Sequence, residues 1–200
     1  MSKRPRPLRN EKCLRTELCD AIQRLDSLAL LPAASGNLSA RLDENAFIIT
    51  PSGTQKRLLT PPDLIEISLN GDVLRATKST KPSIEWKMHS KIYSVRPDVK
   101  AIVHSHPYSV KTLALLDGEL DFSKVAIPEE IEFLGAVIIL PVLQAGSDAL
   151  ADALKTEVEA GRNTLILKAH GAVTLGDSIL QATARTEILD NLSKALLFSR

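Results

Sequence analysis

The 200-residue sequence predicts a three-layer α/β/α domain with a central, largely antiparallel sheet flanked by helices. Two observations support this prediction. Apolar residues recur at helical spacing near both ends of the chain, and short apolar runs separated by turn signals lie between those ends. Because hairpin signals occur together with several helical segments, the sheet is expected to be largely antiparallel. The order of its strands does not follow from the pattern.

The first part of the chain predicts one helix followed by three strands. Residues 11–30 are expected to form an amphipathic helix that ends at Leu31-Pro32, because their apolar residues lie three or four positions apart. These apolar residues are Leu14, Leu18, Ile22 and Leu25. The predicted strands are 46–49, 64–67 and 72–75. Asn70-Gly71, between the last two, is typical of a two-residue hairpin turn.

The rest of the chain alternates between predicted helices and predicted strands. A helix over 83–94 is expected to begin with Ser83 as its N-cap, and it leads into an apolar strand that reaches His104. The further predicted helices are 107–116, 146–160 capped by Ser147 or Asp148, and 177–198 capped by Asp177 or Ser178. The further predicted strands are 136–141 and 164–167.

Composition and charge exclude several classes of partner. A 44% apolar content suffices for one domain, expected over residues 10–200, whereas the basic, proline-rich residues 1–9 are expected to be a disordered tail. The net charge of +1 provides no field that would hold nucleic acid or an anionic membrane. No stretch approaches the roughly 20 apolar residues of a membrane span. We therefore expect neither a nucleic-acid nor a membrane partner.

The two cysteines indicate a reducing compartment. Cys13 and Cys19 lie six positions apart in a predicted helix, a spacing that fits neither a metal motif nor a disulfide framework. Residues 1–9 are followed by a charged segment rather than by the apolar core of a signal peptide. These features predict a cytoplasmic protein with reduced thiols.

Two of the four histidines are placed to bind a metal from one face of a strand. His104 and His106 are separated by one residue at the end of an apolar run, and side chains alternate faces along a strand, so both imidazoles point the same way. His170 follows the predicted strand 164–167 and precedes Gly171, where a loop residue stands on a rigid support. Without the third histidine, an H-x-H pair is more often a pair of surface or hydrogen-bonding residues.

Two loops have the composition of an oxyanion site. Residues 34–39 and 49–54 combine glycine with Ser, Thr and Asn, so that backbone amides and side chains can both donate to an anion. Neither loop is expected to bring a lysine with it. Each loop alone would be interpreted as an ordinary turn. The hydroxyl of Ser83, at a predicted helix N-terminus, makes an anion site the more interesting interpretation.

Taken together, five motifs resemble the class II aldolase/adducin family. They occur in the family's order, and the resemblance extends from about the first helix to the last. The motifs are Ser35-Gly-Asn-Leu-Ser39, Thr50-Pro-Ser-Gly53, Lys81-Pro-Ser-Ile-Glu-Trp-Lys-Met-His89, His104-Ser-His-Pro107 and His170-Gly171. The resemblance implies the fold of that family, which agrees with the three-layer α/β/α prediction.

The resemblance also implies roles for individual residues. His104, His106 and His170 match three histidines that hold a catalytic Zn²⁺, although another divalent metal is an alternative. Glu85 matches the acid/base carboxylate and is expected to bind the metal when substrate is absent. The positions that match the family's phosphate site are Gly36, Asn37, Ser52, Gly53 and Ser83. His89, one helical turn after Glu85, is expected to pack or to form hydrogen bonds rather than to bind metal.

The implied activity is that of a zinc-dependent aldolase. It would cleave a small ketose 1-phosphate such as L-fuculose 1-phosphate to dihydroxyacetone phosphate and an aldehyde, through a metal-stabilised enediolate. The alternatives within the family are a pentulose-phosphate 4-epimerase and a methylthioribulose-1-phosphate dehydratase, and less favoured is a non-catalytic, adducin-like interaction module. The resemblance further implies a homotetramer with its active sites between subunits.

Two features depart from the family pattern. Ile84 stands where the phosphate motif usually has a second serine, which removes one hydroxyl donor. The family also uses tyrosines as acid and substrate contact, whereas this chain has only Tyr93 and Tyr108. Three glutamates lie in roughly the region of a family tyrosine or acid, and they form either a substitute or a solvated face. They are Glu129, Glu130 and Glu132.

Overall fold

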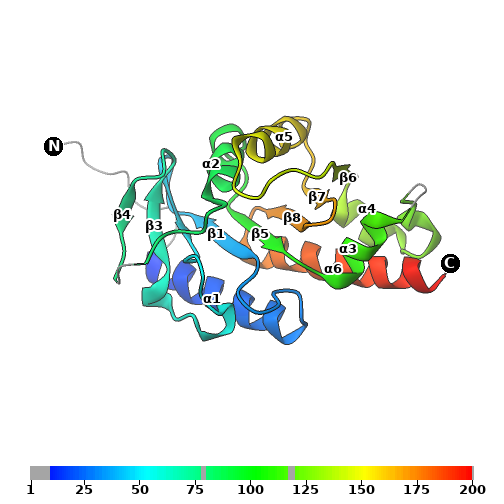
Figure 1. Cartoon of the computed structure of the whole chain (residues 1–200), viewed down its shortest axis with the longest axis horizontal. Coiled ribbons are helices and arrows are strands. Elements are labelled where there is room, and N and C mark those ends of the chain that lie inside the picture. The colour runs from blue at the N-terminus through cyan, green and yellow to red at the C-terminus, as the bar shows by residue number, and fades with distance from the viewer. Residues whose placement is uncertain (1–9, 78–79, 117–119, 200) are drawn as a thin grey trace.

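The described residues of the computed structural model, 10–77, 80–116 and 120–199, form an eight-stranded sheet with α-helices around it (Figure 1). The strand order is β4-β3-β2-β1-β5-β8-β7-β6, and every neighbouring pair is antiparallel except β6 and β7. The strands are β1 Asn37–Arg41, β2 Ala46–Ile49, β3 Ile65–Ser68, β4 Val73–Arg75, β5 Ala101–Ser105, β6 Val137–Leu140, β7 Thr164–Leu167 and β8 Gly171–Gly176. The prediction of a largely antiparallel sheet is confirmed.

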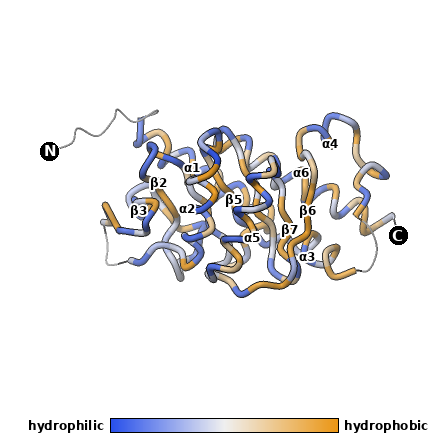
Figure 2. The backbone as a smooth tube through the Cα atoms, turned by 90° about the horizontal axis from the view of Figure 1, so that it is seen from above, coloured by the Kyte–Doolittle hydropathy of each residue, from blue (hydrophilic) through white to orange (hydrophobic). Residues whose placement is uncertain are grey.

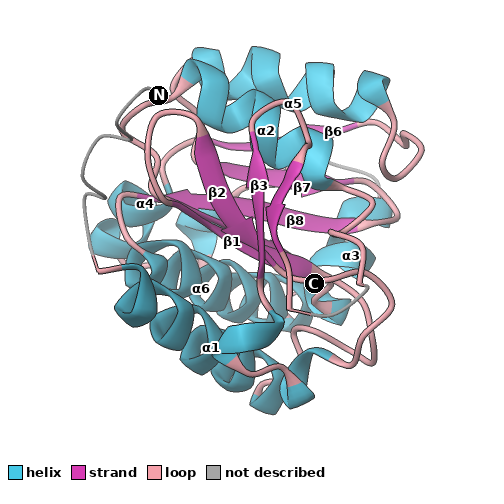
Figure 3. Cartoon of the chain, turned by 90° about the vertical axis from the view of Figure 1, so that its left-hand side faces the viewer, coloured by secondary structure: helices cyan, strands magenta, loops and turns pink. Residues whose placement is uncertain are grey.

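Helices cover both faces of the sheet, as predicted. Helices α1 and α6 lie on one face and α2 and α5 on the other, with the strands between them (Figure 3). The helices are α1 Glu11–Ser27, α2 Trp86–Val95, α3 Tyr108–Leu115, α4 Pro128–Leu134, α5 Asp148–Glu159 and α6 Ile179–Phe198. None of the described helices is both long enough and apolar enough to cross a lipid bilayer. The tail predicted at 1–9 lies outside the described residues.

The alternation of side chains along β5 divides the core and places the first histidine. Val103 packs into the cluster beneath α1, whereas Ile102 packs into the cluster beneath α2 and α5. His104 therefore points to the same face as Ile102. Both faces of the strand are covered, so all five of its residues are buried. The parallel pair β6 and β7 is among the more hydrophobic parts of the chain trace in Figure 2.

Most predicted elements agree with the structure to within two residues at each end. This holds for the three strands in the first part of the chain and for both strands after residue 130. Helices α5 and α6 are capped by Ser147 and Ser178, whose hydroxyls accept hydrogen bonds from Leu150 N at 3.1 Å and Gln181 N at 3.2 Å. Of the alternative caps that the sequence offered, the structure therefore uses the two serines.

The predicted end of α1 and the predicted start of α2 are both wrong. Helix α1 stops at Ser27, because Ala29 adopts a left-handed φ of 59° and Leu30 N donates back to Leu25 O at 2.9 Å. Helix α2 starts only at Trp86, with Glu85 at the N-cap position. Ser83 instead precedes the helix in a turn, where its Oγ accepts from Glu85 N at 3.3 Å and its own N donates to Thr50 O at 3.1 Å.

Two strands and one α-helix did not emerge from the sequence pattern. Strand β1 contains three polar residues, and part of it was interpreted as an anion loop. Strand β8 begins and ends with a glycine and has few large apolar residues to mark it. Helix α4 is only 7 residues long. In β1 the polar side chains face α2 and its flanking segments, where tertiary hydrogen bonds satisfy them, so a polar sequence forms a central strand.

Candidate metal centre

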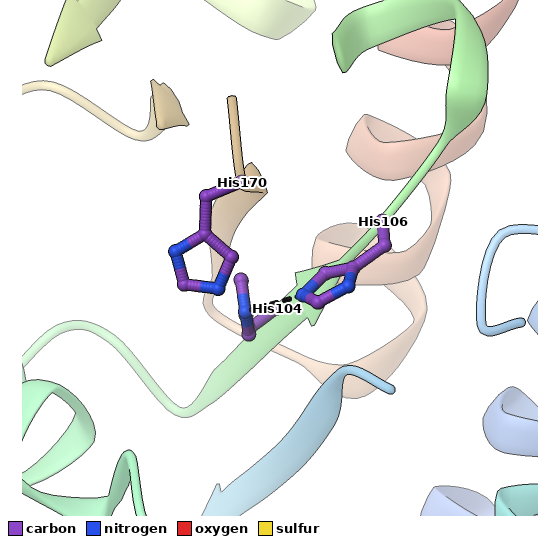
Figure 4. A group of neighbouring side chains, drawn as sticks. All are labelled: His104, His106 and His170. Carbon is purple, nitrogen blue, oxygen red and sulfur yellow. Dashed lines mark hydrogen bonds between the residues drawn. The ribbon is translucent and has the colours of Figure 1, made fainter. Parts of the chain in front are cut away.

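Three histidines converge at the end of the sheet. His104 is the fourth residue of β5, His106 lies just beyond that strand, and His170 lies in the turn between β7 and β8 (Figure 4). One nitrogen from each ring lies within 4.8 Å of the others. The Nε2 atoms of His104 and His106 are 2.9 Å apart. The three rings stand edge to face, with interplanar angles of 70°, 79° and 74° (Figure 4).

Strand β8 brings His170 to the other two histidines. It pairs with β5 in antiparallel register, with His104 opposite Val173 and Ser105 opposite Ala172. Gly171 permits this pairing, because a Cβ atom at this position would collide with the carbonyl oxygen of Ser105 and lie 2.8 Å from the His106 ring. The backbone of β5 thus runs close to the residue after His170, and a larger side chain would separate the ligands.

The orientation of His104 follows from its backbone contact. Its Nδ1 lies 2.9 Å from the carbonyl oxygen of Ala172, which can only accept, so Nδ1 carries a proton. Its Nε2 faces the other histidines and Glu85, and it is the atom that would bind a metal. A metal-ligating histidine is usually oriented in this way, by a hydrogen bond from its other nitrogen.

The other two histidines are also suited to be neutral ligands. Burial, followed by the neighbouring His104 and His170, lowers the pKa of His106 to about 3. Burial, followed by His104, likewise lowers the pKa of His170. Both rings are neutral at pH 7, which is the form of histidine that binds a metal.

The carboxylate of Glu85 completes the cluster. Its Oε2 lies 3.1 Å from His104 Nε2, and its Oε1 lies 3.4 Å from His170 Nε2. Burial alone would raise its pKa, but the charge and hydrogen bond of His104, with smaller effects of His170 and Asn37, lower it to about 2. Glu85 is ionised at neutral pH. Its position at the N-cap of α2, buried, differs from that of a solvent-exposed glutamate in a first helical turn.

This donor set fits a divalent metal. Among the described residues, Glu85 Oε1 accepts no hydrogen bond although it is buried. A buried carboxylate oxygen without a donor is costly, and a cation beside it removes the cost. Three imidazole nitrogens and a carboxylate oxygen are ligands that Zn²⁺ commonly takes in proteins.

The predicted anion loops lie together at one edge of the cluster. Pro51 and Pro82 form an isolated β-bridge, and Ser52 N donates to Lys81 O at 2.9 Å. The structure thus brings Ser52 and Gly53 beside Ser83. Gly53 has a φ of 68°, and a Cβ atom there would meet no other atom within 4 Å, so its backbone faces open space.

The other two predicted phosphate positions serve the histidine cluster as well. Gly36 has a φ of 72°, and a Cβ atom on it would lie only 2.7 Å from His104 O. Asn37 Nδ2 donates to Glu85 Oε2 at 2.8 Å. The structure therefore places the side chain of Asn37 against the carboxylate of Glu85.

Lys56 is the residue that sequence reasoning missed. The expectation that neither loop brings a lysine is wrong, because the Lys56 ammonium is buried between them with only 2% of the residue exposed. Its Nζ donates to Ala34 O at 3.1 Å, Pro51 O at 3.3 Å and Thr54 O at 3.1 Å. The sequence feature that could have identified it is its position, three residues after Gly53. Lys56 joins the two loops and adds a positive charge beneath them.

Replacing Lys56 by methionine is expected to change how stability depends on pH. Burial lowers the pKa of Lys56 from 10.5 to about 8, so between these values the unfolded chain binds more protons than the folded protein. The unfolding free energy of the wild type should therefore rise relative to Lys56→Met as the pH is raised from 7 to 10.5, by at most about 3 kcal/mol. Urea unfolding of both proteins at several pH values measures this difference.

The matched control for this experiment is Lys124→Met, since the side chain of Lys124 is largely exposed. The difference between the wild type and this control should stay constant over the same pH range. Parallel curves for the wild type and Lys56→Met would contradict the assignment of a low pKa to Lys56.

The two departures from the motif pattern have distinct surroundings. Ile84 is 65% exposed, between Ser83 and Glu85. Tyr93 is buried within the core, whereas Tyr108 is 81% exposed, two positions after His106. Glu130 Oε2 accepts a hydrogen bond from Ile127 N at 3.1 Å, which ties that glutamate to the start of α4. Glu129 and Glu132 are exposed on the same helix.

Comparison with known proteins gives consistent matches over most of the chain. The model of the family described as Class II Aldolase and Adducin N-terminal domain matches residues 16–197. An L-fuculose phosphate aldolase of Methanococcus maripaludis is 33% identical over 161 residues, 80% of this chain and 83% of its own. A methylthioribulose-1-phosphate dehydratase of Acidiphilium cryptum is 32% identical over 180 residues, 84% of this chain and 82% of its own.

A solved structure extends the match to three dimensions. The crystal structure of YgbL from Klebsiella pneumoniae, described as a candidate aldolase, epimerase or decarboxylase, superposes with a TM-score of 0.84 at 30% identity. The match covers 96% of this chain and 91% of that one. The similarity thus includes the segments that carry all three histidines and Glu85.

Proposed function

Since the chain belongs to the class II aldolase and adducin family, we propose that it is a zinc-dependent lyase that cleaves a small ketose 1-phosphate. The products are dihydroxyacetone phosphate and an aldehyde, and L-fuculose 1-phosphate is the substrate of choice. The observation that carries the proposal is the cluster of His104, His106 and His170 with the ionised Glu85 in contact with two of its rings.

The three histidines hold the metal in this proposal, and Glu85 is a further ligand in the absence of substrate. Three protein nitrogens leave coordination positions open, which is typical of a catalytic rather than a structural zinc site. The bound metal supplies a Lewis acid that stabilises negative charge as it develops on the oxygens of the substrate. The polar contacts of His104 and Glu85 keep these side chains oriented before substrate arrives.

Glu85 is the acid/base of the reaction in this proposal. It is buried beside two histidines and ionised at neutral pH, so in the reverse, bond-forming direction it can take a proton from the carbon of dihydroxyacetone phosphate. In cleavage its protonated form gives a proton to that same carbon, while the acid opposite Glu85 takes the proton that the substrate hydroxyl releases. Its neighbour Asn37 donates to Oε2 only, which leaves Oε1 as the oxygen with a free lone pair. We assign the proton transfer to Oε1.

The phosphate of the substrate is proposed to bind where the loops meet. Gly36, Asn37, Ser52, Gly53 and Ser83 are the proposed contacts. The open backbone at Gly53 and the buried charge of Lys56 below the loops favour an anion there. Ile84, which replaces a hydroxyl donor, leaves Ser83 as the hydroxyl from this segment.

The remaining features of the proposal concern assembly and location. We propose a homotetramer in which a neighbouring subunit contributes the acid opposite Glu85, since Tyr93 is buried away from solvent. Ile84 and Tyr108 are exposed beside the site, which supports the proposal that a neighbouring subunit covers them. The proposed location is the cytoplasm, and residues 10–200 are proposed to be one domain.

Turnover of three sugar phosphates, together with metal analysis, tests the function. The purified protein is analysed for zinc and incubated separately with L-fuculose 1-phosphate, L-ribulose 5-phosphate and methylthioribulose 1-phosphate. We expect bound zinc and formation of dihydroxyacetone phosphate from the first compound. Turnover of only the second or third compound would reject the aldolase and identify an epimerase or a dehydratase. A protein without metal or activity would instead favour an adducin-like interaction module.

The dehydratase is the second candidate, because the Acidiphilium cryptum relative of that name is almost as similar as the aldolase relative. Both reactions need the same metal and a carboxylate that moves a proton. Loss of water rather than cleavage of a carbon–carbon bond distinguishes them, and mass analysis of the product separates the two outcomes.

A further inference from the structure

A continuous line of buried hydrogen bonds leads from the hydrophobic core to Glu85. Tyr93 Oη lies 2.8 Å from Ser39 Oγ, and Ser39 Oγ lies 2.7 Å from His89 Nδ1. His89 Nε2 lies 2.5 Å from Asn37 Oδ1, and Asn37 Nδ2 donates to Glu85 Oε2 at 2.8 Å. Each of the five residues is buried, and His89 is fully enclosed. We call these five residues the hydrogen-bond line.

All the hydrogen bonds of the line can form together in only one arrangement of donors and acceptors. Asn37 donates from its NH₂ group to the carboxylate of Glu85, and its amide oxygen, which can only accept, faces His89. His89 must then donate from Nε2 and accept at Nδ1. The Ser39 hydroxyl donates to that nitrogen, and the Tyr93 hydroxyl donates to Ser39. The carboxylate of Glu85, the acceptor at the end of the line, therefore determines which atom donates in each of the hydrogen bonds.

The far end of the line is held rigidly. The guanidinium of Arg41 lies 4.5 Å from the centre of the Tyr93 ring, and its Nε donates to Val99 O at 3.0 Å. The ring of Phe47 stacks on His89 with an angle of 11° between the planes. Neither ring can rotate without displacing core residues. The donor that His89 presents to Asn37 is thus fixed in direction.

A histidine is a costly residue to place here for packing alone. Burial, followed by the charge of His104, lowers the pKa of His89 to about 3, so the ring is neutral throughout the physiological range. A leucine or phenylalanine would fill similar space without burying two polar nitrogens. The two nitrogens are used, one as a donor and one as an acceptor, and only the donor leads toward Glu85.

We propose that His89 is a positioning residue which, through Asn37, holds the carboxylate of Glu85 in the orientation that leaves Oε1 directed at His170. This inference rests on the proposed function, since it assigns how the acid/base of that reaction is kept in place. Without the donor at Nε2, the Asn37 amide is free to rotate, and its oxygen can turn toward the carboxylate and repel it. A small change of this kind at a proton-transfer group lowers kcat without weakening substrate binding.

Two substitutions of His89 separate its hydrogen bond from its volume. His89→Gln retains an NH₂ group at the position of Nε2, whereas His89→Leu fills the space and has no donor. We expect His89→Leu to keep its zinc, to change KM by less than about threefold and to lower kcat about 30- to 100-fold. His89→Gln should restore kcat to within about fivefold of the wild type.

The matched control is Ile92→Val, a buried position on the same helix that lies outside the hydrogen-bond line. It removes packing but no hydrogen bond, and its kcat is expected to equal that of the wild type. Equal losses in His89→Leu and His89→Gln, or a His89→Leu protein as active as Ile92→Val, would overturn the proposal. If His89→Leu folds poorly, His89→Gln, which retains the polar group, can still be compared with the wild type.

Nitrogen NMR of His89 gives a readout that does not depend on activity. In the metal-free protein the ¹⁵N shifts should show Nε2 protonated and Nδ1 unprotonated, in one neutral tautomer. A proton on Nδ1, or a mixture of tautomers, would contradict the assigned direction of the line. If the tautomer is as expected but Glu85→Gln retains normal turnover, the proposed function fails while the arrangement of the line stands.

Discussion

Replacing Glu85 by glutamine is expected to leave the metal in place and to lower kcat about 100- to 10,000-fold, the usual contribution of a positioned general acid or base. Glutamine has nearly the same shape, and its carbonyl oxygen can accept the hydrogen bond that Asn37 donates to Glu85. The three histidines are untouched. What the substitution removes is the ability to take up a proton at neutral pH, because an amide is not a base.

Steady-state kinetics with L-fuculose 1-phosphate and metal analysis of the same preparation measure this effect. We expect zinc content near that of the wild type and a KM changed far less than kcat. Glu159→Gln, an exposed position at the end of α5, is the control and should be fully active. Near-normal turnover of Glu85→Gln would remove Glu85 from the acid/base role.

Replacing His170 by alanine is expected to abolish both metal binding and turnover. His170 is one of three nitrogen donors, and two imidazoles that remain cannot enclose the ion as firmly. Loss of the Lewis acid removes several kcal/mol of transition-state stabilisation, which corresponds to roughly a thousandfold in rate or more. His170 lies in a turn and is partly exposed, so the substitution should leave the fold intact.

Chelation and restoration separate loss of the metal from damage to the protein. Wild-type protein treated with a chelator should lose activity and regain it when Zn²⁺ is added, whereas His170→Ala should not respond to the same addition. Activity that survives chelation would contradict the metal-dependent mechanism. A His170→Ala protein that retains zinc and turnover would show that His170 is not a ligand.

Local sequence patterns were sufficient for most of the helices and for one pair of ligands. His104 and His106 stand two positions apart at the end of an apolar run, which predicted that both imidazoles point the same way, and their nitrogens do converge although His106 lies just beyond β5. The caps of α5 and α6 were predicted to within two residues each, Ser147 or Asp148 and Asp177 or Ser178, and the structure uses the serines. Such features depend on residues close together in the chain.

Strand β1 shows where local patterns fail. Asn37, Ser39 and Arg41 alternate with Leu38 and Ala40, which would be typical of a strand with its polar face in solvent, but here that polar face is buried. The structure supplies partners from α2 and from the segments on either side of it: Glu85 and His89 for Asn37, Tyr93 for Ser39, and backbone carbonyls for Arg41. Propensity is overridden because these tertiary hydrogen bonds compensate the burial of each polar group.

The burial and the pKa shifts of Lys56 and Glu85 likewise arise from tertiary contacts. A lysine after a glycine loop suggests an exposed charge, and a glutamate after Ser-Ile suggests the first turn of a helix. In the fold, Lys56 is enclosed by three carbonyl oxygens and Glu85 by two histidines. Burial shifts the pKa of Lys56 down to about 8, while the histidines bring that of Glu85 to about 2.

The sequence by itself determined the family resemblance, the helices with strong apolar spacing and the identity of the candidate ligands. Only the tertiary structure decided that β8 pairs with β5 and brings His170 to His104, that Lys56 lies beneath the anion loops, and that His89 reaches Glu85 through Asn37. Periodicity reports which face of an element is apolar. Contacts between residues such as Asn37 and Glu85, 48 positions apart, depend on how whole elements pack, and no local pattern encodes them.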